Sequence, residues 1–302
     1  MFVLLSKFNV AHYNAQQCKD IIMPVPIHAA VMLGHALGAR MSKPVQGVAL
    51  IVHDARVEQE WLPKPGGKFG DRLLANKRGA TAFYVERSKN GGGYASSSMT
   101  PAAMSYQMHA TANGCFSLAL DFGEADVTVN EVQAQLRVMR FAGGAMHKLQ
   151  RIETALSESE LLSHIRSGYL VMDACDRAEH ALAAGQEPAH VFLHKHRGGY
   201  VVPAVVGYHL ITDLSLERKG IRQSPDIPLE GHAFAESITG LIEFQHVNRY
   251  KFSEPTVADD SAEEVDISSD VTDYQRPPTS LFWHHHWTPD QRSFLIQQAP
   301  QL

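Results

Sequence analysis

The chain has 302 residues, of which 44% are hydrophobic and 20% are charged, so it can bury a substantial core as one large domain or two. It lacks a run of about eighteen apolar residues, and its N-terminus lacks the features of a secretion signal, so we expect a cytoplasmic protein with no membrane partner. Its cysteines, Cys18, Cys115 and Cys175, include no C-x-x-C pair, which argues against a disulfide framework or a thiolate metal site.

The net charge of −5 is unevenly distributed along the chain. Residues 1–90 contain twelve basic and six acidic side chains, whereas residues 258–273 contain seven acids and no base. We interpret the acidic stretch as a solvated loop. The basic first third is typical of a protein that binds a polyanion, and a solvated basic surface is the alternative.

The first third of the chain predicts a strand, a polar loop, a helix and a second strand. Phe2–Leu5 is an apolar run of strand length, and the polar loop follows at Asn9–Asp20. Apolar residues then recur three and four apart from Ile27, as on one face of a helix that ends near Arg40. With Gly47–His53 as the second strand, the pattern predicts a β-α-β unit whose crossover is right-handed.

The segment 61–98 is rich in glycine, proline and positive charge, and it predicts an extended basic loop or hairpin. Aromatic residues are interleaved with the bases, which suits single-stranded RNA because cations neutralise phosphates while rings stack on bases. A basic loop that binds no particular partner is the alternative. The candidate RNA-binding residues of the segment are Lys64, Lys68, Arg72, Lys77, Arg78 and Arg87.

The middle of the chain predicts a strand at Cys115–Phe122 and then a helix. Thr128 and Glu131 have the spacing of a capping box, and the apolar positions after them lie on one helix face. This helix leads to Arg140 and the Gly143-Gly144 pair. Because glycine permits positive φ and close approach of another chain, the pair is suited to holding a phosphodiester backbone, although most Gly-Gly pairs are simple turns.

We expect residues 152–198 to form a helical insertion. Ser157 and Glu160 repeat the capping-box pattern, and helical spacing of apolar residues follows them. Lys195 and Arg197 then lie in a second basic, glycine-containing patch, which we expect to contact nucleic acid or another subunit.

Strand-like composition returns in residues 199–302, mainly at Tyr200–Tyr208 and Phe234–Phe244, and we expect this part to complete the core. Near its end, Trp283–Trp287 contains three consecutive histidines. No H-E-x-x-H helix accompanies them, so we predict that they pack or contact neighbouring chains and bind no catalytic metal.

Matches to one protein family follow the same order along almost the whole chain. They are Asn14-Ala15, Pro24–Arg40, Gly47-Val48 with Val52-His53, Met139–Gly144, Tyr200–Pro203 with Gly207-Tyr208, Ala235-Glu236 with Gly240 and Glu243, and Leu281–His285. Through them the chain resembles the Csy-two (Cas-five type) subunits of type I-F CRISPR surveillance complexes, which belong to the repeat-associated RNA-binding superfamily. It departs from the family pattern at His12 and near Phe244, where the family has asparagine and tryptophan.

The resemblance implies a fold. That fold is α+β, with a ferredoxin-like (RRM-like) RNA-recognition core at residues 1–151, the insertion at 152–198 and a completing part at 199–302. Within it, the resemblance implies that RNA contacts Asn14, Arg140, Gly143 and Gly144.

The resemblance also implies a function without catalysis or cofactor. Such a subunit holds the 5′ handle of the CRISPR guide RNA (crRNA) and caps a backbone of Cas-seven-type subunits. Its further partners are a large subunit, where the system has one, and target DNA, whose protospacer-adjacent motif this chain would read in systems without the large subunit. The alternative is an endoribonuclease that processes precursor crRNA, with His12 or His53 as general acid or base, as in some related Cas-five subunits. In type I-F systems a separate subunit is the processing nuclease, which favours binding alone.

Overall fold

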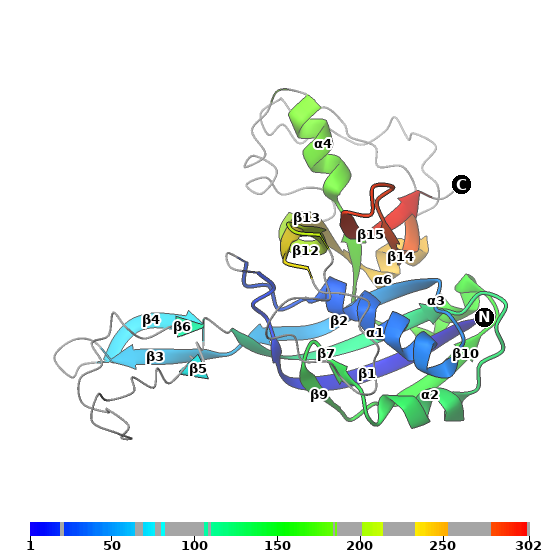
Figure 1. Ribbon diagram of the computed structural model, residues 1–302. Coiled ribbons are helices and arrows are strands. Elements are labelled where there is room, and N and C mark those ends of the chain that lie inside the picture. The colour runs from blue at the N-terminus through cyan, green and yellow to red at the C-terminus, as the bar shows by residue number, and fades with distance from the viewer. Residues whose placement is uncertain are drawn as a thin grey trace, which may run out of the picture.

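The computed structural model describes residues 1–18, 21–63, 69–75, 80–81, 106–107, 110–183, 185, 201–213, 233–252 and 279–300, and between residues 59 and 107 it describes the backbone alone. Figure 1 shows these residues arranged around one large sheet, with helices on both of its faces. None of the described helices is long and apolar enough to cross a membrane.

Three long strands form the centre of the first half of the sheet. β7 (Thr111–Asp121) lies between β1 (Phe2–Asn14) and β2 (Gly47–Val57) and is antiparallel to both. β1 and β2 therefore run in the same direction, and α1 (Ile27–Met41) connects them. The predicted strand-helix-strand order is present, but a third strand separates the two strands.

The other edge of β1 pairs with two short strands in succession. β10 (Arg151–Ala155) pairs with its beginning, and β9 (Gly144–His147) pairs with its second half. β8 (Arg140–Phe141) then pairs with β9. The helices α2 (Val129–Leu136) and α3 (Glu158–His164) precede β8 and follow β10.

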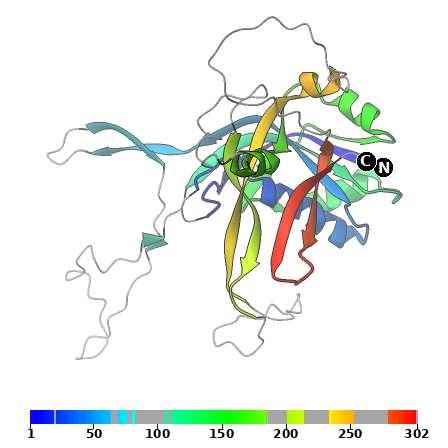
Figure 2. The ribbon, with the colours of Figure 1, turned by 90° about the horizontal axis from the view of Figure 1, so that it is seen from above.

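The second half of the sheet closes into a ring of six strands. The pairings run from β2 through β14, β15, β12, β13 and β11 and back to β2. Figure 2 shows the β12–β13 and β14–β15 pairs side by side. The bounds of the five further strands are β11 (Tyr169–Asp173), β12 (Val201–Leu210), β13 (Ala235–His246), β14 (Thr279–Trp287) and β15 (Ser293–Pro300).

Four shorter strands and two helices complete the described elements. α4 (Cys175–Ala183) follows β11, and α6 (Val247–Phe252) follows β13. Two separate two-stranded ribbons extend away from the main sheet in Figures 1 and 2. Their strands are β3 (Gln59–Pro63), β4 (Phe69–Ala75), β5 (Ala80–Thr81) and β6 (Tyr106–Gln107).

The apolar run at the start of β1 is explained by burial on both sides. Successive side chains of a strand point to opposite faces, so Val3 and Leu5 join the core beneath α1 and α2, while Leu4 joins a second core with Leu161 and Phe282. All three β1 residues are at most 1% exposed. A strand covered on both faces is apolar throughout rather than alternating.

The expected ferredoxin-like α+β fold with a helical insertion is wrong. The structure is dominated by an 11-stranded sheet, and residues 152–198 contribute two of its strands, β10 and β11. Ser157 caps a helix of only seven residues, and the predicted capping box is incomplete because Glu160 accepts from the N–H of Leu156 rather than from that of Ser157. The short segments on either side of it, the mixed Arg151–Ala155 and the apolar Tyr169–Asp173, form strands because neighbouring strands pair with them, which periodicity within the segment does not reveal.

Other predictions for single elements have mixed outcomes. The helix that begins at Ile27 is confirmed, but the loop predicted at Asn9–Asp20 is wrong in its first half, because β1 continues to Asn14. The acidic loop 258–273 and most of the basic segment 61–98 lie outside the described residues.

Candidate nucleic-acid interface

A tight hairpin between β8 and β9 presents the glycine pair. Phe141 and Gly144 are opposite each other in the pairing, and Ala142 and Gly143 between them have φ values of 47° and 81°. Two successive residues with positive φ form the two-residue hairpin turn that matches the twist of the strands. Gly143 suits this turn because glycine adopts positive φ without steric cost.

The base of the hairpin is fixed to the core. Phe141 is fully buried, and its ring centre lies 5.1 Å from that of Phe116 and 5.6 Å from that of Phe8. Gly144 lies so close to β1 that a Cβ atom there would be 2.7 Å from the Cβ of Tyr13. The turn is therefore held in place by close packing at its base, while Gly143 at its tip is exposed and has open space around it.

Asn14 lies beside this hairpin, although about 130 residues separate them in the chain. Its backbone N–H donates a 2.9 Å hydrogen bond to the carbonyl oxygen of Ala142. The exposed Arg140 side chain folds over the turn, with Nη1 donating to the carbonyl oxygen of Gly143 at 3.4 Å. Four predicted site residues, Asn14, Arg140, Gly143 and Gly144, are thus brought together at one end of β1.

A groove of about 440 Å³ adjoins Arg140. It lies between α1 and the segment 138–140, with Met32, Ala36 and Val138 among its apolar residues and Arg40 and Arg140 as its charged residues. Val138 is 67% exposed, so its side chain is accessible from the groove. Apolar surface between guanidinium groups is suited to holding bases and phosphates of a single strand.

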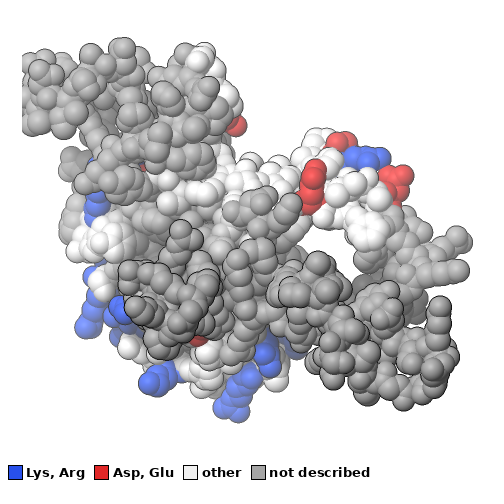
Figure 3. All heavy atoms as spheres, turned by 90° about the vertical axis from the view of Figure 1, so that its left-hand side faces the viewer, with Lys and Arg blue, Asp and Glu red and all other residues white. Residues whose placement is uncertain are grey.

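Positive charge extends along this side of the molecule. Figure 3 shows Lys and Arg side chains along its lower edge, the level at which Figure 1 places α2 and β9. The exposed cations in this region of the chain are Arg40, Arg137, Arg140, Lys148 and Arg151. Such a cluster raises the local concentration of polyanions despite the negative net charge.

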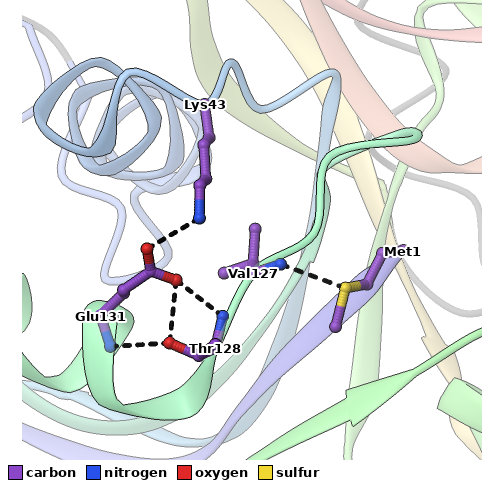
Figure 4. A network of polar contacts seen from close by, with 5 residues as sticks. All are labelled: Met1, Lys43, Val127, Thr128 and Glu131. Carbon is purple, nitrogen blue, oxygen red and sulfur yellow. Dashed lines mark hydrogen bonds and ion pairs between the residues drawn. The ribbon is translucent and has the colours of Figure 1, made fainter.

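The start of α2 is fixed by a polar network that also involves α1 (Figure 4). Thr128 and Glu131 form a complete capping box, as the sequence predicted. Lys43, just after α1, donates a 2.8 Å hydrogen bond to the same Glu131 carboxylate. The negative charge of this acid is therefore balanced by Lys43. Hydrogen bonds from Lys43 and Thr128 lower the pKa of Glu131 to about 2. The network fixes the helix that leads to Arg140.

His12 lies on β1 two residues before Asn14, and its side chain is paired with an acid. Its Nδ1 is 2.6 Å from an Oε atom of Glu58. Burial raises the pKa of Glu58, but hydrogen bonds from Thr111 and Asn113 together with the neighbouring His12 outweigh it, so the pKa is lowered. Glu58 is therefore ionised at neutral pH, and it can orient the exposed imidazole of His12.

The remaining candidate residues have different outcomes. Arg72 lies in β4, where only the backbone is described. The other basic candidates lie outside the described residues: Lys64, Lys68, Lys77, Arg78, Arg87, Lys195 and Arg197. The sequence reasoning missed Arg40 and the exposed Val138. In the sequence, Arg40 is only an arginine in the last turn of a helix, and Val138 is only an apolar residue outside the predicted helical face. Neither feature predicts a groove, because the groove forms only where α1 and the segment 138–140 lie side by side in the fold.

The histidine-rich stretch lies within β14 and packs against other elements. Trp283 is fully buried, and Nδ1 of His284 lies 2.8 Å from the carbonyl oxygen of Gln46. The ring centre of His285 lies 4.4 Å from that of His35 on α1. The predicted packing role is confirmed. Within the described part of the chain, no three His, Cys, Asp or Glu side chains are grouped to hold a metal ion.

Comparison of the chain with protein-family models and with curated proteins finds no match. The family resemblance drawn from the sequence therefore stays a prediction.

Proposed function

We propose that the protein is a non-catalytic crRNA-binding subunit of a type I-F CRISPR surveillance complex, and that it holds the 5′ handle of the guide RNA. The observation that supports this proposal best is the position of Asn14 beside the β8–β9 hairpin. The family resemblance assigns RNA contacts to these two segments, and they come from opposite ends of the first half of the chain.

The chemistry of the site is compatible with RNA. Arg140 supplies a planar guanidinium group that can bind a phosphate through two parallel hydrogen bonds. The exposed Gly143 leaves room for a sugar-phosphate backbone to approach the turn closely. The groove between α1 and Val138 can accept a base adjacent to that phosphate.

The proposal includes partners and a location. The subunit caps a backbone of Cas-seven-type subunits in the cytoplasm and also contacts target DNA. It contacts a large subunit where the system has one. Where the system has none, this chain reads the protospacer-adjacent motif itself.

Binding of a handle RNA, followed by fluorescence anisotropy over a range of salt concentrations, tests the proposal. Arg140→Ala should weaken binding about tenfold even at low salt, because a charge-assisted phosphate contact is lost. Arg292→Ala is the matched control, since this exposed arginine pairs with Asp213 on a different part of the molecule. Equal affinities of the Arg140 variant and the control variant would contradict the assignment of the hairpin.

The basic segment 61–98 is tested in the same assay. Replacing Lys64, Lys68, Lys77 and Arg78 together by glutamine should flatten the salt dependence, by roughly 0.7 in slope for each phosphate contact removed. Footprinting of the assembled complex then locates the RNA. An unprotected 5′ handle would show that this surface does not hold it.

An endoribonuclease that processes precursor crRNA is the second candidate, and the His12–Glu58 pair favours it. A histidine oriented by a carboxylate is a common general base, and this one lies two residues from Asn14. Under the main proposal, purified protein binds precursor RNA without cutting it. Cleavage that disappears in His12→Ala or His53→Ala would establish the nuclease instead.

A further inference from the structure

A second polar pocket opens on the face of the sheet opposite α1 and α2. It has a volume of about 230 Å³ and lies between the centre of the sheet and the segment that follows α3. The sheet contributes Ser6 and Lys7 of β1, Arg151 of β10, His53 of β2 and Ser117 of β7, and the segment after α3 contributes Arg166. The hairpin site lies farther along β1, so the two sites are separate.

A bulge in β1 positions the inner part of the pocket. The pairing of β1 with β7 shifts between Leu5 and Phe8, and Lys7 within the shift has a φ of 45°. The backbone N–H of Lys7 consequently donates to Oγ of Ser117 at 2.9 Å instead of to a neighbouring strand. Nε2 of His53 lies 2.7 Å from the same Oγ. Bulges are typically found beside functional sites, where they redirect side chains.

The outer part is held by α6. Lys251 donates from Nζ to the carbonyl oxygen of Ile165 at 2.6 Å, and the N–H of Val247 donates to the carbonyl oxygen of Gly168 at 3.0 Å. Gly168 has a φ of 124°, and a Cβ atom there would be 3.0 Å from the ring of His53. These contacts fix the segment that carries Arg166 and Ser167 over the pocket.

The charges in this pocket are of one sign. Lys7, Arg151 and Arg166 are cationic, and none of the eleven described residues that line it is acidic. Arg151 also pairs with Glu153 at 2.9 Å. Burial, reinforced by the charge of Lys7, lowers the pKa of His53 to about 4, so His53 is neutral at pH 7 and can accept or donate one hydrogen bond. Nδ1 of the neighbouring His164 is buried and has no hydrogen-bond partner among the residues that the structure describes.

We propose that this pocket binds a phosphate group, through the cations Lys7, Arg151 and Arg166 and with the Ser117 and Ser167 hydroxyls as further donors. Three convergent cations with hydroxyl donors are the groups that recognise phosphate oxygens. The phosphate belongs either to a free nucleotide or to the RNA backbone. The RNA backbone as the source rests on the proposed function. Lys7 is four residues from Ala11, which pairs with β9, so about 13 Å of β1 separates the pocket from the hairpin, a distance that one RNA strand can span.

Calorimetric titration of the full chain with inorganic phosphate at low salt tests the proposal directly. We expect a dissociation constant of about 1 mM, well within the limit for a ligand of five non-hydrogen atoms. Arg166→Gln and Lys7→Gln should each weaken binding about tenfold. Arg292→Gln, which removes one charge far from the lining, is the matched control and should bind phosphate as the parent does. Glu153→Gln should tighten binding severalfold, because Arg151 then has no competing carboxylate.

Two further titrations distinguish the sources of the phosphate. Adenosine 5′-monophosphate should bind at least as tightly as phosphate if the ligand is a free nucleotide. If the pocket holds the RNA backbone, Arg166→Gln should weaken binding of the handle RNA, in addition to the effect of Arg140→Ala. Absence of binding for all three probes, or equal binding by Arg166→Gln and the control, would overturn the proposal. Phosphate binding that survives Arg140→Ala while RNA binding fails would overturn the proposed function alone.

Discussion

The indole Nε1 of Trp283 donates a 2.8 Å hydrogen bond to the carbonyl oxygen of Val171, joining strands that are 112 residues apart in the chain. Trp283 lies in β14 and Val171 in β11, the two strands that each pair with part of β2. The bond therefore crosses the inside of the six-stranded ring, where Trp283 is fully buried. A buried indole N–H requires such a partner, so this residue both fills the ring and satisfies the backbone of the strand opposite.

Trp283→Phe should lower the free energy of unfolding by about 2–3 kcal/mol. Phenylalanine leaves a cavity and an unsatisfied carbonyl oxygen on Val171, and both costs apply to a buried site. Chemical denaturation measures the change. The control is Trp287→Phe in the same strand, where the side chain is 46% exposed and the change should be within about 0.5 kcal/mol. Equal effects of the two substitutions would show that the buried bond is not important.

Thr128→Ala should destabilise the protein by about 1 kcal/mol. The substitution removes the side chain that caps α2 by accepting from the backbone N–H of Glu131. Thr128→Ser retains the hydroxyl group and should be close to neutral in thermal unfolding. If Thr128→Ser lowered the stability as much as Thr128→Ala does, the methyl group of Thr128, rather than its hydroxyl cap, would be what stabilises the helix.

The Glu131 carboxylate should titrate near pH 2 in a carbon-detected NMR titration. Its pKa is lowered chiefly by the hydrogen bond from Lys43 and then by the bonds from Thr128. Since the folded-state pKa lies below the ordinary value of 4.5, the stabilisation is complete above pH 4.5 and is lost as the pH falls toward 2. Lys43→Gln should move the titration upward. An unchanged titration in that variant would contradict the assigned cause.

Protein stability should decrease between pH 6.5 and pH 4 partly because of His28. Burial lowers the pKa of this imidazole to about 4, and its Nε2 is buried with no hydrogen-bond partner in the described part of the chain. Across this range the unfolded chain binds a proton at His28 that the folded protein does not, so stability rises with pH. His28→Phe keeps an aromatic ring beside Tyr208 and Phe294. It should reduce the slope of the unfolding free energy against pH by the equivalent of about one bound proton. Unfolding curves at several pH values measure it, and an unchanged slope would exclude His28 as a source.

The two glycines of the β8–β9 hairpin should respond differently to alanine. Gly144→Ala should cost about 2–3 kcal/mol, because the new Cβ would lie 2.7 Å from atoms of Tyr13 and Val10. Gly143→Ala meets no atom within 4 Å, so only its positive φ opposes the change and the cost should be about 1 kcal/mol. Thermal unfolding ranks the two. The reverse order would mean that the hairpin base is less tightly packed than its geometry indicates.

Local features were predicted well from the sequence when their cause was local. The helix at Ile27 and the capping box at Thr128 depend on spacings of a few residues, which the sequence displays directly. The meeting of Asn14 with the β8–β9 hairpin was suggested only by family resemblance, because no spacing rule relates residues so far apart.

The sheet itself could not be predicted in this way. β10 and β11 are five residues each, and they are strands because β1, β2 and β13 lie beside them. The pocket at Lys7 and His53, proposed above to bind phosphate, was missed for a related reason. Lys7, His53, Ser117 and Arg166 come from four separate segments, and only the bulge in β1 and the pairing of β1, β7 and β2 bring them together.

β2 pairs with β7 on one edge and with β11 and β14 on the other, which affects the order in which the sheet can fold during synthesis. One edge of β2 can pair with β7 once about 120 residues have been made, but its other edge pairs with β11 and β14, and β14 ends at Trp287. β11 can cover this edge at Ile51 and Val52 once about 170 residues have been made, but the edge at Val48 is uncovered until β14 has been made. Pairings so distant in sequence form slowly, and exposed strand edges invite association with other chains. A nascent chain that stops before β14 would therefore be prone to aggregate, so chaperone protection would matter until β14 has been made.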